Sequence, residues 1–374
     1  MGSRKQSDSA GAPSAHGRFT AACRVLEKAI AARAFPGCAF GVMAGGEVLH
    51  TGALGRYTYD KTSPAVQPET LYDVASLTKV VATTAMVMLL VQRSQLDLDM
   101  PLGKVLPGFI EGRTPGDAAR LVTLKHLLAH NSGLPGYVEL FRLANTPELL
   151  LRSCLQLPLE AEPGMRAEYS DPGFILLGKA LETLLGESLS PWLQREVYAP
   201  LGMTATGFCP ERALRAAIPP TEEDTTFRHR RIQGEVQDEN ASVLKGIAGH
   251  AGLFSNVPDL LRFAGAILGA VPSGGLLKLF EPQTIDQFSQ RQAPEGSSRA
   301  LGWDTPSANS SAGKYFSSHS IGHLAYSGCS LWIDLNAAIA VVLLTNRTWP
   351  DRKNQAIRAV RPAFHDAIRE ALLQ

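Results

Sequence analysis

The chain has 374 residues, of which 45% are hydrophobic, so it can bury a large core and exceeds the commonest size of a single domain. Thirty-six basic against 35 acidic residues leave a net charge of +1, which argues against a nucleic acid or an anionic membrane as partner. We therefore expect two domains and a small neutral or modestly charged substrate.

The N-terminal segment over residues 1–17 carries basic residues with no apolar core after them, which predicts a disordered tail and no secretion signal. The longest uncharged apolar run, residues 80–91, is shorter than the roughly 20 residues needed to cross a bilayer. We therefore expect a cytoplasmic protein without a membrane span. The cysteines are odd in number and form no CxxC pair, which predicts reduced thiols; they are Cys23, Cys38, Cys154, Cys209 and Cys329.

Both ends of the chain carry the same pattern of elements. Residues 18–35 have helical periodicity, and residues 37–55 read as two strands around a Gly45-Gly46 turn. Residues 329–347 read as two strands around an Asp-Leu-Asn turn, followed by an amphipathic helix over residues 354–374. The two hairpins predict one antiparallel sheet that is built from both termini and covered by helices.

The middle of the chain has short helical patterns separated by glycine and proline, which predict a helical insert. These patterns cover residues 124–135, 146–157, 174–186 and 258–269. The predicted class is α+β. We expect a sheet domain over residues 18–75 and 240–374 and a mainly helical domain over residues 76–239, with the active site between them.

A serine followed by a lysine three residues later occurs three times, and this spacing alone is common by chance. Only Ser76 opens a strongly apolar helical run, where Lys79 shares its helix face and unpaired first-turn N–H groups can stabilise an oxyanion. Burial would lower the pKa of the lysine and make it a base. The alternative is a capping serine and a lysine that extends along the apolar surface to water. The other pairs are Ser242/Lys245 and Ser311/Lys314.

Two further stretches carry candidate functional groups. In "AEYSDPGF", Asp171 is either an N-cap or a functional carboxylate, whereas Tyr169 lies outside the helix and could transfer a proton. In "SIGHLAYSGCSLWID", His323 stands at the head of the C-terminal hairpin, where a strand edge can offer a backbone N–H to the nucleophile. The alternative for His323 is an ordinary polar residue at a strand start.

A metallohydrolase and an α/β-hydrolase are two alternatives to a catalytic serine–lysine pair. The pairs His126/His130 and His319/His323 have i, i+4 spacing, but neither is His-Glu-x-x-His, so we interpret His126 and His130 as structural residues and expect no metal. No Gly-x-Ser-x-Gly occurs, which excludes an α/β-hydrolase. Nothing in the sequence calls for a cofactor.

The three stretches, in this order, resemble the serine β-lactamase and penicillin-binding protein superfamily. The resemblance runs from about residue 18 to the C-terminus and is strongest to the class C-like branch, which also holds family VIII carboxylesterases and peptidoglycan amidases. It implies a β-lactamase/transpeptidase-like fold, with Ser76 as the acyl-forming nucleophile and Lys79 as its partner base. Tyr169 matches the tyrosine of the Tyr-x-Asn motif, and His323 heads the segment that matches Lys/His-Thr-Gly. The implied oxyanion hole is the backbone N–H groups of Ser76 and Tyr326.

The sequence departs from the family pattern at two places. Asp171 stands where β-lactamases typically have asparagine, and a carboxylate there favours protonated Lys79 and passes more of the base role to Tyr169. Leu324-Ala325 replace Thr-Gly and remove a hydroxyl from the strand beside the acyl group. We therefore expect a serine hydrolase that acts through a serine acyl-enzyme as a carboxylesterase on small uncharged acyl esters. The alternatives are a β-lactamase, a peptidoglycan amidase or D,D-peptidase, and a non-catalytic penicillin-binding-type sensor.

Overall fold

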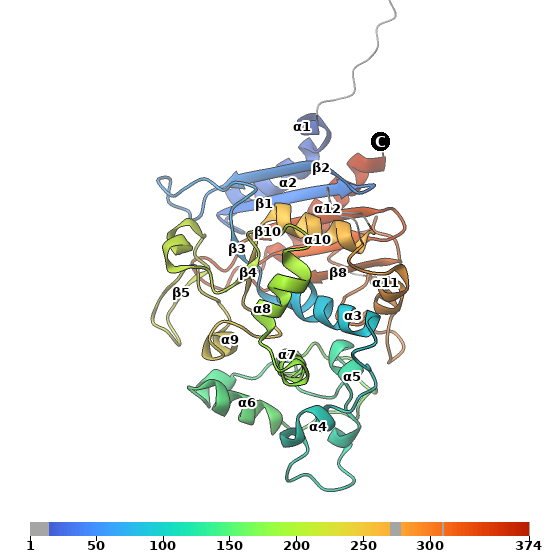
Figure 1. The fold of residues 1–374 in the computed structure, drawn as a ribbon. Helices are drawn as coiled ribbons and strands as arrows, with labels where there is room; N and C mark the ends of the chain where they lie inside the picture. The colour runs from blue at the N-terminus through green and yellow to red at the C-terminus, as the bar shows by residue number, and fades with distance from the viewer. Residues whose placement is uncertain (1–14, 270–277, 309, 374) are drawn as a thin grey trace, which may run out of the picture.

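The computed structural model describes residues 15–269, 278–308 and 310–373 (Figure 1). Residues 1–14 of the predicted tail lie outside the described residues, and helix α1 (Ala15–Arg18) follows them. A five-stranded antiparallel sheet with the order β2-β1-β10-β9-β8 forms the upper part of the molecule in Figure 1. Its strands are β1 (Gly37–Ala44), β2 (Glu47–Gly55), β8 (Ser320–Leu324), β9 (Ser330–Asp334) and β10 (Ile339–Thr345).

The central strands of this sheet come from opposite ends of the chain. Strand β1 pairs with β10, and Cys38 lies opposite Thr345. Alternate residues of β1 point to opposite faces, so that Phe40 and Ala39 enter different hydrophobic clusters. The prediction of one antiparallel sheet built from both termini is therefore confirmed, and its central strands β1 and β10 are buried on both faces.

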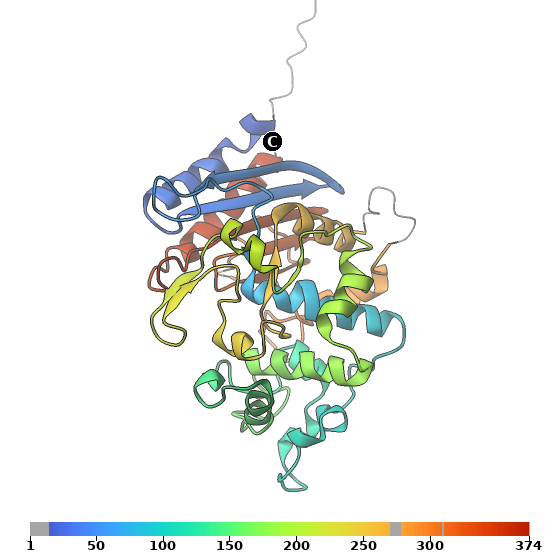
Figure 2. The same cartoon turned by 60° about the vertical axis from the view of Figure 1, so that its left-hand side comes forward.

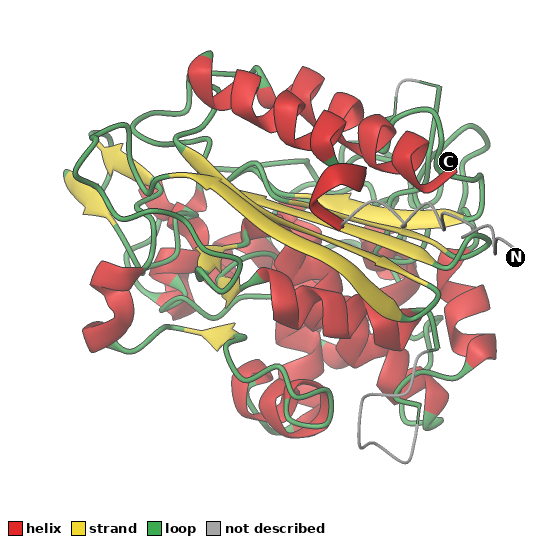
Figure 3. Ribbon diagram, turned by 90° about the horizontal axis from the view of Figure 1, so that it is seen from above, coloured by secondary structure: helices red, strands yellow, loops and turns green. Residues whose placement is uncertain are grey.

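Two helices cover one face of the sheet: α2 (Thr20–Ala31) and α12 (Ile357–Leu373). Figure 3 shows both helices lying along the same side of the strands. Their apolar sides, which include Phe364 of α12, close over Phe40 and Trp332 of the sheet, in agreement with the amphipathic pattern of both termini.

The opposite face is covered by α10 (Val257–Ile267), which packs on β1 and β10. Gly41 permits this close approach, because a Cβ atom there would overlap the side chains of Val257 and Leu261. Residues 258–269 form a helix, as predicted. The helix packs against the sheet and not with the other helical patterns of the middle segment, and the predicted sheet domain over residues 240–374 includes it.

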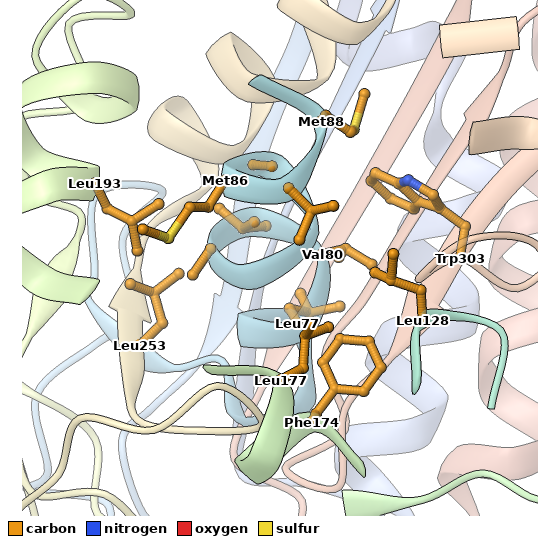
Figure 4. Packing of buried hydrophobic residues seen from close by; sticks show 14 of the residues in the cluster. Leu77, Val80, Met86, Met88, Leu128, Phe174, Leu177, Leu193, Leu253 and Trp303 are labelled. Carbon is orange, nitrogen blue, oxygen red and sulfur yellow. The ribbon is translucent and has the colours of Figure 1, made fainter. Parts of the chain in front are cut away.

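A buried helical segment runs through the centre of the molecule. It consists of the 3₁₀ turn η1 (Ala75–Leu77), the π-helical turn η2 (Lys79–Thr84) and α3 (Ala85–Gln92). Ala75–Gln92 is long and apolar enough to cross a membrane by length and composition alone, but 83% of it is buried inside the protein, as in the core helix of a globular fold. Figure 4 shows the apolar side chains packed on and around it, including Leu77, Val80, Met86, Leu128, Phe174, Leu193, Leu253 and Trp303.

Helices α4 to α7 lie on the far side of this central segment from the sheet, as Figures 1 and 2 show. The helical patterns over residues 146–157 and 174–186 are confirmed by α6 and α7, whereas only residues 124–128 of the pattern over residues 124–135 are helical, in α5. The helices not yet described are α4 (Leu102–Val105), α5 (Leu124–Leu128), α6 (Pro147–Leu155), α7 (Asp171–Leu185), α8 (Leu189–Leu193), α9 (Glu239–Val243) and α11 (Pro282–Ser289). Short helical turns are η3 (Pro107–Phe109), η4 (Ala118–Leu121), η5 (Leu140–Arg142), η6 (Gln194–Tyr198) and η7 (Arg212–Ala217).

Two small antiparallel sheets complete the α+β architecture. Strands β3 (Tyr72–Asp73), β7 (Leu253–Ser255) and β4 (Gly207–Phe208) form one, and β5 (Glu222–Asp224) and β6 (Arg230–Ile232) form the other. Strand β3 leads directly into η1, so its pairing with β7 fixes the start of the central helical segment. The boundary between two domains at residues 76 and 239 remains a prediction.

Candidate active site

A cavity of about 690 Å³ brings the three predicted stretches together. Ser76 contributes from η1, Tyr169 and Asp171 from the start of α7, and His323 and Tyr326 from the end of β8 and the turn after it. The start of α9 and the start of α12 form further parts of the wall. A concave site with several ionisable groups is the usual form of an enzyme active site.

Ser76 follows a strained residue. Ala75 has φ of 43°, a left-handed conformation that is uncommon for residues with a Cβ. The buried carboxylate of Asp73 holds this turn, because it accepts a hydrogen bond from the Ala75 N–H at 2.8 Å. The residue before η1 is Val74, with no side-chain cap, so the interpretation of Ser76 as a helix cap is wrong.

Lys79 lies at the centre of the site. Its Nζ donates to Ser76 Oγ at 3.2 Å, to Asp171 Oδ1 at 2.6 Å and to the His250 carbonyl at 3.0 Å. The side chain is 0% exposed, so the alternative of a lysine that extends to water is wrong. Among the described residues, the other two serine–lysine pairs have no such side-chain hydrogen bond.

The ionisation of Lys79 is set by two opposing effects. Burial lowers its pKa, but the carboxylate of Asp171 and the Tyr169 oxygen raise it, and the net pKa is above the usual value. The expectation that Asp171 favours protonated Lys79 is confirmed. The expectation of a lysine pKa depressed by burial is wrong.

Ser170, and not Asp171, caps helix α7. Ser170 Oγ accepts from the Gly173 N–H at 3.1 Å and donates to the Pro135 carbonyl at 2.7 Å. Asp171 is the first residue of the helix, and its carboxylate is directed to Lys79. The N-cap interpretation of Asp171 is therefore wrong, and the interpretation of a carboxylate that partners the lysine is the one the contacts support.

Tyr169 lies just outside the helix, with its ring over the lysine. The Lys79 Nζ is 4.8 Å from the ring centroid. Burial and the Asp171 carboxylate raise the pKa of the Tyr169 phenol, Lys79 and hydrogen bonding to the Lys79 and Ser76 side chains lower it, and the net pKa is above the usual value. The phenol therefore contacts both members of the Ser76–Lys79 pair and can exchange protons with them.

Two histidine rings flank Tyr169: the ring centroid of His130 is 4.7 Å away and that of His323 is 5.8 Å away. His323 Nδ1 donates to the Leu324 carbonyl at 2.8 Å, and His130 Nδ1 accepts from the Ser170 N–H at 3.0 Å. Burial, together with nearby positive charge from Lys79 and Arg299, holds the pKa of each ring well below its usual value. Both rings are therefore neutral at pH 7.

The histidines weighed as metal ligands have other partners. His126 Nδ1 accepts from the Thr123 N–H at 3.1 Å as part of a capping box, and His319 Nδ1 lies 3.1 Å from Asn336 Oδ1. Within residues 15–269, 278–308 and 310–373, no group of three His, Cys, Asp or Glu side chains is arranged to hold a metal ion. His130 was interpreted only as a structural residue from the sequence, because its contact with Tyr169 exists only in the folded chain.

A histidine–aspartate pair, His250 and Asp238, supports Lys79 and was not identified from the sequence. His250 Nε2 lies 2.8 Å from Asp238 Oδ1, and the backbone carbonyl of the same histidine accepts from Lys79. Burial raises the pKa of Asp238, but His250, the Ala241 N–H and the charge of Lys79 together lower it further, and the net pKa is about 2. The stretch "GHAGLFS" has no recognisable catalytic spacing, so only the tertiary contact identifies His250 as a support of the site.

Comparison with known proteins identifies the family. The Beta-lactamase family model matches residues 23–363. The chain belongs to the beta-lactamase family. It is a serine hydrolase of the β-lactamase and penicillin-binding protein superfamily, and the resemblance seen in the sequence is confirmed.

Individual relatives have different activities. The chain is 30% identical over 360 residues to N-acetylmuramyl-L-alanine amidase of Bacillus subtilis (strain 168), covering 87% of this chain and 80% of that protein. Among solved structures it is similar to EstCE1, a hydrolase with promiscuous acyltransferase activity, with TM-score 0.74, 23% identity, and coverage of 95% and 98%. A penicillin-binding protein homologue from Caulobacter crescentus has TM-score 0.73 and 19% identity, with coverage of 95% and 97%. These two structures show the shared fold.

Proposed function

We propose that this serine hydrolase is a carboxylesterase that acts on small uncharged acyl esters through a covalent acyl-enzyme on Ser76. The observation that carries the proposal is the hydrogen-bonded group of Ser76, Lys79, Tyr169 and Asp171 at the wall of the cavity. A nucleophile within reach of a proton acceptor that is itself oriented by a third group is the usual arrangement for covalent catalysis.

Tyr169 is the proposed base, because Asp171 keeps Lys79 protonated. In the reactive form Tyr169 is a phenolate stabilised by the Lys79 ammonium. Ser76 Oγ bonds to the ester carbonyl carbon and transfers its proton to the Tyr169 oxygen. When the tetrahedral intermediate collapses, the carbon–oxygen bond to the alcohol breaks and Tyr169 returns the proton to the leaving alkoxide. Water then repeats the sequence on the acyl-enzyme and restores Ser76.

Two backbone N–H groups, those of Ser76 and Tyr326, are the proposed oxyanion hole. Both residues line the cavity. Preorganised donors of this kind act where charge develops in the transition state, and removing one typically costs about 10² to 10³ in kcat.

The preference for uncharged acyl groups follows from His323 and Leu324. His323 is neutral at pH 7, since burial and nearby cations hold its pKa low, and Leu324 has no hydroxyl to bind a carboxylate. Arg299 also lines the cavity, but Asp304 lies 3.9 Å from it and offsets its charge. An unpaired carboxylate buried at this strand would lose several kcal/mol of hydration.

A direct comparison of substrates tests the proposal. Short-chain p-nitrophenyl esters should be hydrolysed over many turnovers at pH 7 to 8 with a higher kcat/KM than any β-lactam or D-Ala-D-Ala peptide. Faster turnover of a penicillin or cephalosporin than of the esters would contradict the proposal and indicate a β-lactamase. One acylation without turnover would indicate a sensor.

A second candidate is an amidase acting on peptidoglycan fragments. It is favoured by the 30% identity to the Bacillus subtilis amidase over 87% of this chain. Release of peptide from purified muropeptides, with a kcat/KM above that of the p-nitrophenyl esters, would favour this candidate over the esterase.

A further inference from the structure

The turn between β8 and β9, residues 325–329, is held by a buried arginine. Arg361 of α12 donates from Nη2 to the carbonyls of Ala325 at 2.6 Å and Cys329 at 2.9 Å, and from Nε to the carbonyl of Gly328 at 3.1 Å. The planar guanidinium reaches all three acceptors at once, which a lysine ammonium could not match in geometry.

Arg361 is a buried cation without an anionic partner. It is 6% exposed, and among the described residues no carboxylate lies within 4.0 Å of its nitrogen atoms. Burial lowers its pKa to about 10. A buried charge that is not paired is costly, so its retention beside the active site calls for a functional explanation.

A second arginine holds the remaining carbonyls of the same turn. Arg347 donates from Nε to the Tyr326 carbonyl at 2.7 Å, and from its backbone N–H to the Ser327 carbonyl at 2.9 Å. Its guanidinium carbon also lies 4.3 Å from the centroid of the Tyr326 ring, which is 49% exposed in the cavity wall. All five carbonyl oxygens of the turn therefore accept hydrogen bonds from within the protein.

The contact with the Ala325 carbonyl orients one particular peptide group. The C=O of Ala325 and the N–H of Tyr326 belong to the same planar unit, and in a trans peptide they point in opposite directions. Because the carbonyl is directed to Arg361, the N–H of Tyr326 is directed away from α12. Donation to the carbonyl also polarises the peptide and strengthens its N–H as a donor.

We propose that Arg361 is the positioning residue of the oxyanion hole, acting through the Ala325–Tyr326 peptide, with Arg347 supporting the same turn from its other side. This inference rests on the proposed function of the Tyr326 N–H. The two guanidinium charges also lie behind the turn at which the negative oxygen would develop, so their charge favours the transition state.

The packing around Gly328 agrees with a turn that must keep one shape. Gly328 has φ of 100°, and a Cβ atom there would overlap Thr345 Oγ1 and come within 2.7 Å of the Arg347 side chain. The turn therefore has no room to rearrange toward β10 without losing its contacts with the arginines.

The test compares Arg361→Met with a matched control at Arg113. Arg113 is also largely buried and also donates to backbone carbonyls, those of Phe109 at 2.8 Å and Leu157 at 2.7 Å, but it is not part of the cavity wall. Arg361→Met should lower kcat for a p-nitrophenyl ester about 10- to 100-fold, with KM within about threefold of the wild type. The loss is smaller than for a deleted donor because the N–H remains and is only misdirected. Arg113→Met should leave both constants unchanged.

The affinity for an arylboronic acid tests the positioning role directly, because it should not change if Arg361 only stabilises the fold. It forms a tetrahedral adduct with a serine, and its anionic oxygen occupies the oxyanion position, so its affinity reports on transition-state binding. The inhibition constant should rise in Arg361→Met by the same factor by which kcat falls. Arg361→Lys, which keeps the charge and a donor, should recover part of both and remains available if the methionine variant fails to fold.

Two results would overturn the positioning role of Arg361 while leaving the esterase proposal intact. One is an unchanged boronic acid affinity in Arg361→Met, and the other is an equal loss of kcat in the Arg361 and Arg113 variants. The proposed function is checked separately by fluorophosphonate labelling of the wild type. No label on Ser76 would overturn the proposed function, and with it this role of Arg361.

Discussion

Lys79 and Asp171 form a buried ion pair, with Nζ 2.6 Å from Oδ1, between the start of η2 and the first turn of α7. The pair couples the nucleophile's own helix to the segment that carries Tyr169. Removing one partner of such a pair leaves the other charge buried and uncompensated. The protonation of the whole site therefore depends on Asp171.

The first prediction concerns Asp171→Asn. The carboxylate raises the pKa of both Lys79 and Tyr169, so its removal lowers both, and the acidic limb of the pH profile of kcat/KM should shift to lower pH. The variant should keep its activity near neutral pH. Steady-state rates from pH 5 to 10 measure the shift.

Ser170→Ala is the control for a purely structural effect of this segment. It removes the cap of α7 and should cost about 1 kcal/mol in the free energy of unfolding without moving the acidic limb. A pH profile of Asp171→Asn that superimposes on the wild type would contradict the assigned coupling.

The ion pair also predicts how stability depends on alkaline pH. The pKa of folded Lys79 is raised above its unfolded value of 10.5, so its contribution to stability is complete below that pH and is lost as pH rises through the folded pKa. Asp171→Asn should remove this alkaline loss. Urea unfolding between pH 9 and 11 checks it, and equal slopes in the two proteins would refute the assignment.

Tyr169→Phe should lower kcat/KM by about 10² to 10⁴ with the fold intact, because the phenol is the proposed proton carrier. Tyr59→Phe is the matched control: its hydroxyl donates to the Arg33 carbonyl at 2.8 Å, and it lies outside the cavity. Circular dichroism and ester hydrolysis should separate the two. A loss of less than tenfold in Tyr169→Phe would point to another base.

Ser76 should be the only acylated serine. A fluorophosphonate should add one adduct to the intact protein, peptide mapping should place it on Ser76, and Ser76→Ala should abolish it. Ser242 and Ser311 should stay unlabelled, because neither has a side-chain hydrogen bond to its lysine among the described residues. Label on either of them would remove Ser76 from the mechanism.

His323→Lys should change acyl-group selectivity. A lysine there adds a cationic group at the cavity wall, whereas the wild-type ring is neutral at pH 7. The ratio of kcat/KM for a p-nitrophenyl ester with a terminal carboxylate to that for an uncharged ester of equal length should rise about tenfold or more. His323→Gln, which adds no charge, should leave the ratio low. Equal ratios in the lysine and glutamine variants would rule out charge at this position as the determinant.

Acid should destabilise the fold through buried neutral histidines. Burial lowers the pKa of His365 to about 4, so below an unfolded pKa of about 6.5 the unfolded chain binds a proton that the folded chain does not. This histidine should cost up to about 1.4 kcal/mol per pH unit as pH falls from 6.5 to 4. His365→Gln should reduce the slope of unfolding free energy against pH by that amount in urea titrations.

The slope for His365→Gln must be compared with the wild-type slope, because Asp73 changes the stability in the opposite direction over part of this pH range. The pKa of Asp73 is raised by burial to about 6, so between pH 4 and 6 the folded chain holds the extra proton and stability falls as pH rises. An unchanged slope in His365→Gln would show that this histidine is not buried in its neutral form.

Some parts of the site could be predicted from the sequence because they are local. Lys79 contacts Ser76 since residues three apart share a helix face, and the near-continuous apolar runs of β1 and β10 are typical of strands buried on both faces. Periodicity and turn residues report such short-range relations directly. The resemblance to a known family then placed Tyr169 and His323 at the same site.

Only the tertiary structure decided the ionisation and support of that site. Whether Asp171 caps a helix or pairs with Lys79 depends on which of two nearby oxygens faces the N–H groups of α7, and Ser170 takes that position. The role of Arg361 depends on the packing of α12 behind the turn between β8 and β9. Strands β9 and β10 separate this turn from α12 in the chain. The hydrophobic pattern of the sequence predicts which residues can be buried. The balance between burial and pairing that sets a pKa, or directs a peptide N–H, exists only between groups that folding brings together.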